Sequence, residues 1–360
     1  MINKKIDKIT ICADFGIDEI ACDGASTKAR NILEVFIKKF GSNNVKKNHF
    51  SSWKKHPFKN YKSLKKSFID SKYIVLMPSP MRLIIISLFA KKWVKKYNCK
   101  VLYSVVGGWL PTYIKKYSIV RTACSSFTAI FVETHGMEKA LKEMGMINIY
   151  YSPVFSLRLP LDENVFRTKV DTMEKAISKN VFHFCTFSRV DYNKGILIAI
   201  DSIKCISSIY QNATIDLTIY GKISPSFEND FKLAIEANQK NVKYGGIIPD
   251  DKVISTLSDY FMLLFPTFFF GEGFPATLLE SYMAGLPAIA SNWKYNSELI
   301  DNGINGILFD PITVDGLNNA IENIINNKEK IILFKKNVYV FSKKFTPECA
   351  LNVIFNFIDD

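Results

Sequence analysis

Short, almost wholly apolar runs alternate along the chain with longer stretches whose apolar residues recur every three or four positions. A short apolar run is typical of a strand buried on both faces, and the longer period is typical of a helix packed on a sheet. Their alternation predicts an α/β protein with parallel sheets. The predicted strands cover 8–13, 73–77, 100–105, 129–133, 181–187, 214–220, 242–244, 261–265, 287–290 and 306–309. The predicted helices cover 26–40, 83–97, 136–144, 194–208, 227–238, 251–258, 275–284, 313–326, 328–341 and 346–358.

The chain is long enough for two domains, since it has 360 residues and about half of them are apolar. The stretch from Tyr151 to Thr168 is polar and fits neither period, so it is predicted to be an irregular join. The predicted domains cover residues 1–155 and 156–344, with a last helix at about 345–360.

The segment from Gly271 to Ser281 carries two carboxylates, Glu272 and Glu280, on either side of a Gly-Phe-Pro turn. Proline suits the first position of a helix, so a helix is predicted to begin at Phe274 or Pro275 and to end before Gly285. Glu272 then lies in the loop before the helix and Glu280 lies about two turns inside it. Because a helix start offers free N–H groups and a positive dipole end, it suits a phosphate.

A carboxylate accepts hydrogen bonds from a diol, so this segment matches phosphate and polyol together, which is the chemistry of a nucleotide sugar. The alternative is that Glu272 and Glu280 are solvated charges around an ordinary helix start. The segment lies between two predicted strands of a parallel sheet, and ligands bind such sheets at strand-to-helix turns. This context favours the binding site.

Residues 266–309 resemble the signature region of the retaining family 4 glycosyltransferases of GT-B fold. The resemblance rests on the pair of glutamates spaced as E-x7-E and on three later motifs. The segment from Ser291 to Glu298 is similar to members from bacterial capsule and exopolysaccharide synthesis. The later motifs are Ala284-Gly285-Leu286-Pro287, Asn296-Ser297-Glu298 and Asp301-Asn302-Gly303-Ile304-Asn305-Gly306.

The resemblance implies GT-B architecture, with two Rossmann-like domains whose parallel sheets face a cleft. It implies that the N-terminal domain binds the acceptor, that the C-terminal domain binds the nucleotide sugar, and that the last helix packs back on the first domain. It gives Glu280 the ribose diol and Glu272 the sugar hydroxyls. Around the helix start, the expected donor contacts are Gly273, Phe274, Ala276 and Thr277.

Arg189 and Lys194 follow a predicted strand and open a helix. Two cations at such a place can clamp a diphosphate and neutralise the charge that grows on a leaving group. The matching family motif carries an arginine and a lysine in this role, at the same spacing. The alternative, a solvated loop with a lysine at a helix start, is less favoured beside Glu272 and Glu280.

The remaining candidates follow from the resemblance alone. Gly24 matches a glycine loop that approaches the diphosphate, although relatives often have two adjacent glycines there, and a plain turn is the alternative. Gly246 and Ile247 match the nucleobase region, with a structural turn as the alternative. Glu298 is expected near the ribose or phosphate, with helix capping as the alternative. Relatives place a histidine where this chain has Gly108 and Trp109, which are expected near the acceptor. His135 lies in another loop, where a surface or helix-capping role is the favoured interpretation.

Charge is distributed unevenly along the chain. Residues 1–160 hold 28 Lys and Arg against 10 Asp and Glu, and residues 161–360 hold 19 against 24. The first half therefore calls for an anionic partner. Nucleic acid is one such partner, but no nucleic-acid motif accompanies the charge.

Phe89, Trp93 and Tyr97 recur every fourth residue among lysines, a pattern that suits the interface of an anionic membrane. The alternative is an amphipathic helix whose aromatic residues pack on their own sheet. No apolar run is long enough to cross a bilayer. The lysines of this membrane-facing prediction are Lys91, Lys92, Lys95 and Lys96.

Seven dispersed cysteines and four scattered histidines show no metal-ligand spacing, so neither a metal nor another cofactor is predicted. The sequence predicts a cytoplasmic retaining glycosyltransferase at the inner face of a cell membrane, acting on a lipid-linked saccharide with a UDP-sugar as the expected donor. A GT-B epimerase or hydrolase of nucleotide sugars is the nearest alternative. No residue stands out as a nucleophile, which favours front-face substitution.

Overall fold

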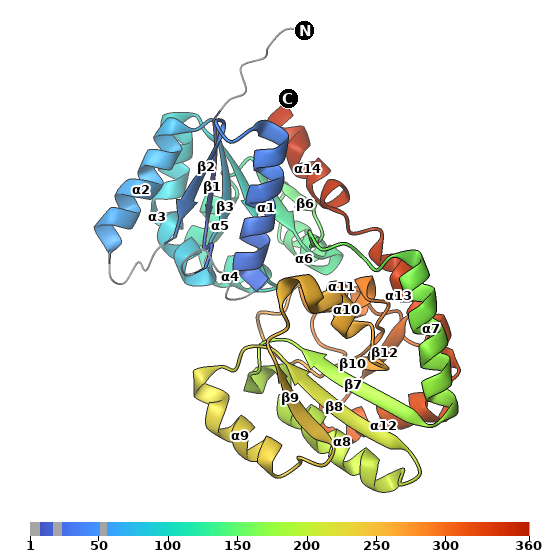
Figure 1. The fold of residues 1–360 in the computed structure, drawn as a ribbon. Coiled ribbons are helices and arrows are strands. Elements are labelled where there is room, and N and C mark those ends of the chain that lie inside the picture. Colours follow the sequence, from blue (N-terminus) through green and yellow to red (C-terminus); the bar gives the residue numbers. More distant parts are fainter. Residues whose placement is uncertain (1–7, 17–23, 51–55, 360) are drawn as a thin grey trace. The chain divides into compact units, whose positions relative to one another are not determined.

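The computed structural model describes residues 8–16, 24–50 and 56–359, and the chain divides into two compact units. Unit 1 comprises Met1–Leu157 and Thr346–Asp360, and unit 2 comprises Arg158–Phe345. Each unit holds a six-stranded sheet in which every neighbouring pair of strands is parallel. The predicted α/β fold with parallel sheets is confirmed (Figure 1).

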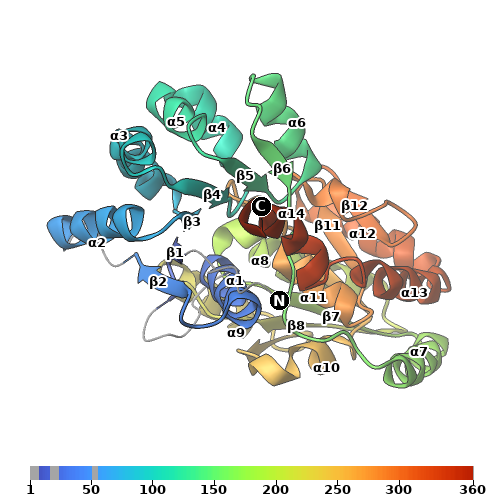
Figure 2. The ribbon, with the colours of Figure 1, turned by 90° about the horizontal axis from the view of Figure 1, so that it is seen from above.

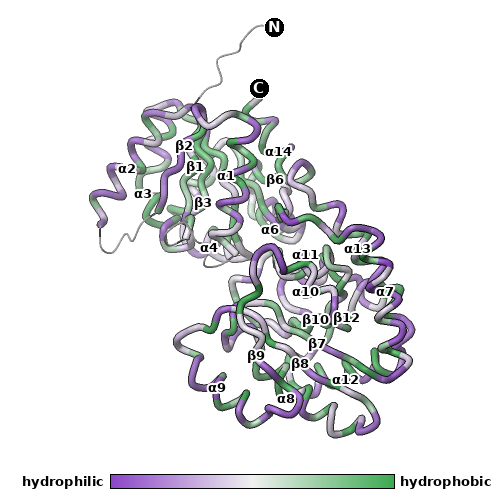
Figure 3. Tube along the Cα trace, in the orientation of Figure 1, coloured by the Kyte–Doolittle hydropathy of each residue, from purple (hydrophilic) through white to green (hydrophobic). Residues whose placement is uncertain are grey.

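Unit 1 has the strand order β2-β1-β3-β4-β5-β6. The inner strands are uniformly buried, as their unbroken apolar runs predict, whereas the edge strand β2 carries two exposed lysines. Figure 3 shows the inner strands as hydrophobic and helix α2 as largely hydrophilic. The strands are β1 (Ile9–Ala13), β2 (Val45–His49), β3 (Tyr73–Met77), β4 (Lys100–Ser104), β5 (Ala129–Val132) and β6 (Ile149–Tyr151).

Helices cover both faces of this sheet: α1 and α14 lie on one side, and α2, α3, α4 and α5 lie on the other (Figure 2). Helix α14 comes from the end of the chain, and its Phe355 packs 5.3 Å from Phe36 of α1, between ring centroids. The Ser152 hydroxyl also donates to the Ala350 carbonyl over 2.7 Å. The helices are α1 (Gly24–Phe40), α2 (Pro57–Asp70), α3 (Pro80–Tyr97), α4 (Leu110–Lys116), α5 (Ser118–Cys124), α6 (His135–Glu143) and α14 (Pro347–Asp359).

Unit 2 has the strand order β12-β11-β10-β7-β8-β9. Counted from its own first strand this is the order 3-2-1-4-5-6 of a dinucleotide-binding fold, whose connections reverse direction between β7 and β10. The strands are β7 (Val181–Phe187), β8 (Thr214–Tyr220), β9 (Val242–Gly246), β10 (Met262–Phe265), β11 (Ala288–Ser291) and β12 (Gly306–Phe309).

The core of unit 2 forms where α8 and α12 pack side by side against the sheet, while α11 packs against α13. Helix α11 is followed by Gly285 at φ +63°, which confirms the predicted helix end. The α-helices are α7 (Glu163–Ser178), α8 (Ile196–Ile209), α9 (Glu228–Glu236), α10 (Val253–Leu257), α11 (Ala276–Met283), α12 (Val314–Asn326) and α13 (Lys330–Ser342). The 3-10 turns are η1 (Tyr192–Lys194), η2 (Pro225–Phe227), η3 (Asp250–Lys252) and η4 (Asn296–Glu298).

The predicted irregular join is wrong over its last part, because residues 163–178 form helix α7. Asp162 caps this helix by accepting hydrogen bonds from Asn164 and Val165, and its buried residues recur every three or four positions. The sequence analysis also omitted β2, β6, α2, α4 and α5. β2 is lysine-rich, and β6, α4 and α5 are short. The buried face of α2 is half polar, which weakens the apolar signal. Among the described residues, no helix has the length and apolar character needed to cross a bilayer.

Lys335 is a buried lysine that connects α13 to the end of α11 and the start of β10. Its side chain is 3% exposed, and the ammonium donates to the carbonyls of Tyr260 (2.9 Å) and Gly285 (3.4 Å). Burial lowers the pKa of Lys335 from 10.5 to about 7, because the charged form loses its hydration. The unfolded chain therefore binds more protons than the folded chain above about pH 7, and this residue makes stability rise with pH there.

Between about pH 6.5 and about pH 8, we expect the free energy of unfolding of the wild type to rise by about 1 kcal/mol more than that of Lys335→Met. Urea unfolding at a series of pH values measures the difference. Lys330→Met, an exposed position on the same helix, is the matched control and should follow the wild type. Identical pH profiles for the wild type and Lys335→Met would contradict the shifted pKa.

Candidate functional site

The site lies at the carboxyl ends of β7 and β10, the neighbouring strands between which the connections of unit 2 reverse. From β7 the chain continues to β8 on one side, and from β10 it continues to β11 on the other. The loops at residues 188–195 and 266–275 therefore lie side by side at this edge of the sheet, the usual place for a ligand in such a fold. Both loops carry residues that the sequence analysis singled out.

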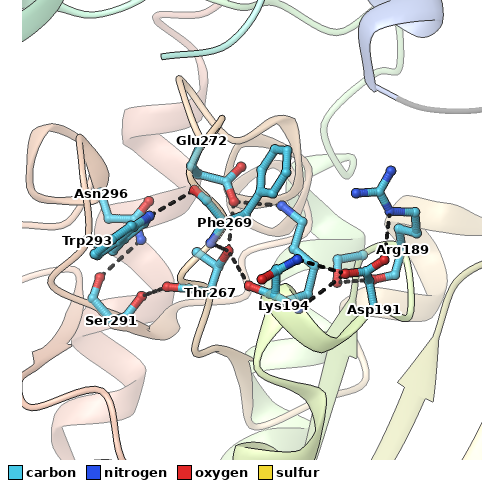
Figure 4. Close-up of polar contacts among 11 residues, drawn as sticks. Arg189, Asp191, Lys194, Thr267, Phe269, Glu272, Ser291, Trp293 and Asn296 are labelled. Atoms are coloured by element: carbon cyan, nitrogen blue, oxygen red, sulfur yellow. Dashed lines mark hydrogen bonds and ion pairs between the residues drawn. The ribbon is translucent and has the colours of Figure 1, made fainter. Parts of the chain in front are cut away.

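Lys194 and Glu272 meet across these two loops (Figure 4). The Lys194 ammonium is 2.6 Å from Oε2 of Glu272, and the Thr267 hydroxyl donates to the same oxygen over 2.8 Å. The two charged side chains are only 12% and 9% exposed. Such a buried pair fixes both groups, because each would be costly to bury without the other. Thr267 is a member of the site that the sequence analysis missed.

The loop after β7 is shaped by Asp191 and Gly195. Asp191 accepts hydrogen bonds from the Asn193 amide (3.1 Å) and the Ser224 hydroxyl (2.7 Å). Burial acts to raise the pKa of Asp191, but these hydrogen bonds and the nearby Arg189 outweigh it and lower the pKa. Gly195 has φ +69°, and a Cβ there would lie 2.1 Å from the Pro266 carbonyl oxygen. Only glycine permits this approach of the two loops.

Arg189 stands at the outer part of the site. Its Nε lies 3.8 Å from Asp191 Oδ2, and its side chain is 44% exposed, so the guanidinium reaches solvent. In Figure 4 the dashed contact of the Arg189 guanidinium leads to Asp191, and none leads to Lys194 or Glu272. The guanidinium carbon lies 5.8 Å from the centroid of the Phe269 ring, and the Lys194 ammonium lies 5.0 Å from the same centroid. The aromatic ring thus stabilises both cations.

The loop that carries Glu272 is held from behind by residues that sequence reasoning did not select. Trp293 donates from Nε1 to the Phe269 carbonyl over 2.8 Å, and Ser291 donates to the Thr267 carbonyl over 2.5 Å. Asn296, which is fully buried, donates to the Ser291 carbonyl over 3.0 Å. The hydrogen bonds of Ser291, Trp293 and Asn296 are visible in Figure 4. Asn296 belonged to a family motif in the sequence, but its contact partner lies five residues away and could not be read from spacing.

Glu280 lies in the second turn of α11, close to the predicted depth, with a side chain that is 9% exposed. It forms an ion pair with Arg158, which also binds the carboxylate of Asp250. Pro275 is the N-cap of α11, so the amides of Ala276 and Thr277 belong to its first turn, and Gly273 and Phe274 immediately precede that turn. Nothing in the sequence pattern indicated Arg158.

The end of β9 offers an open, partly apolar surface. Gly246 has φ +78° with open space where a Cβ would be, and Ile247 is 66% exposed. Tyr244 donates from its hydroxyl to the Gly221 carbonyl over 2.8 Å. Gly221 has φ +134°, and a Cβ there would lie 1.8 Å from the Ser188 carbonyl oxygen, which ties this surface to the loop of Arg189.

Glu298 is exposed in η4 and lines a cavity of about 470 Å³. The lining of this cavity includes Asp301, Asn305 and Asn337 but neither Glu272 nor Glu280. Glu298 thus borders a different cavity from the one expected for a ribose contact, and its predicted role stays a prediction. Among the described residues, no group of three His, Cys, Asp or Glu side chains is arranged to hold a metal ion.

In unit 1 the structure corrects the predicted role of Trp109. Its ring is 5% exposed, donates from Nε1 to the Val106 carbonyl over 2.7 Å and packs on Tyr113, so it is part of the core rather than an acceptor surface. Gly108 is buried beside it. Gly24 begins α1 and is exposed, with open space where a Cβ would be, whereas Asp23 lies outside the described residues.

His135 is 67% exposed at the first position of α6, where it contacts Glu138 and stacks on Tyr151 with 3.8 Å between ring centroids. This agrees with the surface role favoured for it.

The predicted membrane-facing helix is α3, and the structure corrects its aromatic part. Trp93 is 4% exposed and packs against Tyr61, Phe68 and Phe89, so it cannot reach a lipid headgroup. The alternative of an amphipathic helix is right that this tryptophan packs inside the protein, but its ring partners lie on α2 and α3 rather than on the sheet. The four lysines of the same helix, Lys91, Lys92, Lys95 and Lys96, are all exposed.

Part of the chain matches a known family model. Residues 170–340, a little under half of the chain, match the family model described as glycosyl transferases group 1. The chain is 27% identical over 205 residues to an uncharacterized glycosyltransferase of Methanocaldococcus jannaschii, a match that covers 54% of each. The chain thus spans about half the length of this curated relative.

Two solved structures resemble almost the whole chain. HepE of Anabaena in complex with UDP is 13% identical, with a TM-score of 0.73 and coverage of 98% of this chain and 99% of HepE. Sucrose-phosphate synthase of Thermosynechococcus elongatus is also 13% identical, with a TM-score of 0.75 and coverage of 98% of both chains. Both are GT-B proteins, and the predicted GT-B fold is confirmed.

Removing the cation of the buried pair should be costly. We expect Lys194→Met to lower the free energy of unfolding by about 3 kcal/mol, because Glu272 would keep its charge with only the Thr267 hydroxyl as partner. The double variant Lys194→Met/Glu272→Gln should recover part of this loss. Urea unfolding of Lys194→Met, Glu272→Gln and the double variant measures these losses. Lys232→Met, whose partner Glu236 is half exposed, is the control. A loss in the double variant equal to the sum of the two single losses would contradict the coupling.

Proposed function

We propose that this chain, whose residues 170–340 match the glycosyl transferases group 1 model, is a glycosyltransferase that transfers a sugar from a UDP-sugar to a lipid-linked saccharide. The transferred sugar would keep the configuration of its anomeric carbon. One observation carries it: the Lys194–Glu272 pair lies at the point of unit 2 where the strand connections reverse, and the Arg189 guanidinium lies over the same Phe269 ring as the Lys194 ammonium.

The donor would bind to unit 2 with its diphosphate against Arg189. This guanidinium is half exposed and offers paired donors to phosphate oxygens. Glu280 would accept from the ribose hydroxyls and Glu272 from the sugar hydroxyls, while the amides of Ala276 and Thr277 face the phosphate side. The base would lie on Gly246 and Ile247, where the backbone is open and an apolar side chain is exposed. HepE, which is similar in fold, is described in complex with UDP and with UDP-glucose.

The chemistry would be a front-face substitution. The acceptor hydroxyl oxygen forms a bond to the anomeric carbon while the bond between that carbon and the β-phosphate oxygen breaks on the same face. The electron pair of the broken bond stays on the phosphate, which takes the acceptor proton. Arg189 and Lys194 stabilise the charge that develops on the leaving diphosphate, and this stabilisation is the main contribution of the protein.

Glu272 would serve this reaction by orientation. Its Oε2 already accepts from Lys194 and Thr267, so its direction is set before a donor arrives. A preset carboxylate holds the sugar with little loss of side-chain freedom on binding. Lys194 is in turn held where the diphosphate would lie.

The acceptor would be a lipid-linked saccharide at the inner face of a cell membrane, in capsule, exopolysaccharide or O-antigen synthesis. The support is the net charge of +18 on residues 1–160, together with the exposed lysines of α3. Anionic headgroups attract such a surface without any tryptophan anchor. Unit 1 would thus bind the acceptor and unit 2 the donor.

A panel of nucleotide sugars tests this function. The protein is incubated with each donor and a polyprenyl-diphosphate-linked saccharide, and products are identified by mass spectrometry and by the anomeric coupling in NMR. Transfer with retention is expected with a UDP-sugar. Conversion of the donor without transfer would instead support an epimerase or hydrolase.

We expect Arg189→Ala to lower kcat about a hundredfold while changing KM much less, because the cation acts on charge that is largest in the transition state. Steady-state kinetics with the accepted donor measure both constants. Arg167→Ala, which removes a 71% exposed arginine of the same unit, is the control and should leave both unchanged. An effect on KM alone would make Arg189 a ground-state clamp.

We expect the protein to pellet with anionic vesicles and not with neutral ones, and to be released by high salt, because exposed lysines act over a Debye length of about 8–10 Å. Replacing Lys91, Lys92, Lys95 and Lys96 by Gln should weaken this binding. Replacing four exposed lysines of unit 2 by Gln is the matched control. Equal weakening by both sets would show that net charge, and not the α3 surface, is responsible. The control set is Lys175, Lys179, Lys232 and Lys240.

A further inference from the structure

Arg158 is a partly buried arginine to which neither the sequence motifs nor the proposed reaction gives a role. It is the first residue of unit 2, and its side chain is 20% exposed. The guanidinium forms ion pairs with the carboxylates of Glu280 and Asp250, and its Nε also donates to the Asp250 carbonyl over 3.2 Å. All three groups belong to unit 2.

The two partners of Arg158 come from the two elements expected to hold the nucleoside. Glu280 belongs to α11 and is the proposed acceptor for the ribose hydroxyls. Asp250 begins η3, three residues after Ile247 on the loop proposed for the base. Arg158 therefore joins the ribose carboxylate to the base loop through a single planar side chain.

The two ion pairs differ in exposure. Glu280 is 9% exposed and Asp250 is 87% exposed, so the Glu280 pair is shielded from water and the Asp250 pair is not. A shielded arginine–carboxylate pair has a fixed geometry, whereas an exposed one contributes little. Arg158 thus acts mainly on Glu280, and its contacts with Asp250 add little.

The neighbours of Glu280 on its helix face the core, so Arg158 is the residue that orients the Glu280 carboxylate. Leu278, Leu279 and Ser281 are fully or almost fully buried, and Ser281 donates to the Leu278 carbonyl. Arg158 binds Oε1 of Glu280. A carboxylate held at one oxygen presents its second oxygen in a defined direction.

We propose that Arg158 is a positioning residue that orients Glu280 for the ribose and thereby makes the protein selective for ribonucleotides. The inference rests on the proposed function, because it takes Glu280 as the ribose contact. Arg158 itself does not touch the reacting atoms. Its loss should matter only for ligands that carry ribose hydroxyls.

Calorimetric titration with UDP and with 2′,3′-dideoxy-UDP tests this, using the wild type, Arg158→Ala, Arg158→Lys and Glu280→Gln. The wild type should bind UDP at least about tenfold more tightly than the dideoxy analogue, as expected for a hydrogen bond to a carboxylate. Arg158→Ala should lose most of this preference while binding the analogue as the wild type does. Arg158→Lys, which keeps the charge but cannot reproduce the planar fork, should lose part of it.

Combining Arg158→Ala with Glu280→Gln should cost no more UDP affinity than Glu280→Gln alone, since the arginine acts through the glutamate. The melting temperature of each variant is measured alongside, and Arg167→Ala serves as the control for loss of an arginine. Arg158→Lys keeps the test decisive if Arg158→Ala folds poorly.

Three results would overturn the proposal. Tighter binding of UDP by Arg158→Ala would show that the arginine competes with the ribose. Equal losses for UDP and the analogue would show a general structural role, and unchanged binding would show no role. A wild type without preference for UDP would instead refute the assignment of the ribose to Glu280, and a wild type that binds neither ligand would refute the donor proposal together with this inference.

Discussion

The site depends on the adjacency of β7 and β10, two strands that are far apart in the sequence and neighbours in the sheet. Because the strands are parallel, their carboxyl ends meet at one edge, and the loops that follow them lie side by side there before the connections diverge. A lysine from one loop and a glutamate from the other can then pair in a place that water hardly reaches. The close approach of Gly195 to Pro266 and the hydrogen bonds behind Phe269 all serve to keep these two loops together.

Each charged group of the site has a partner of its own in unit 2. Lys194 has Glu272, Arg189 has Asp191, and Glu280 has Arg158. Charges of low exposure are costly unless paired, so the same contacts that allow these groups to be buried also fix their directions. Under the proposed function, a donor would then meet groups that are already oriented, so little side-chain freedom would be lost when it binds. The exposed guanidinium of Arg189 is the group best placed to change partners.

Much of this fold follows from periodicity alone, because the inner strands are uninterrupted apolar runs and most helices have a clear buried face. Prediction failed where tertiary contact overrides local pattern: β2 is a lysine-rich edge strand, and α7 begins inside a polar stretch that gave no apolar run. At the site, Glu272, Glu280, Arg189 and Lys194 were recognisable by spacing and resemblance. Arg158 and Thr267 were not, since their partners lie 122 and 5 residues away and only the fold brings them into contact. Trp93 was misread because an aromatic period on a helix does not say which side faces the core, and Trp109 because the resemblance placed its region near the acceptor without saying where the ring points.

The most direct measurement of the central claim is a crystal structure of the protein with UDP bound. The account predicts the diphosphate against the Arg189 guanidinium and the Lys194 ammonium, the ribose hydroxyls on Glu280, and the base over Gly246 and Ile247. Nucleotide bound elsewhere in the chain, or a ribose that makes no contact with Glu280, would contradict it.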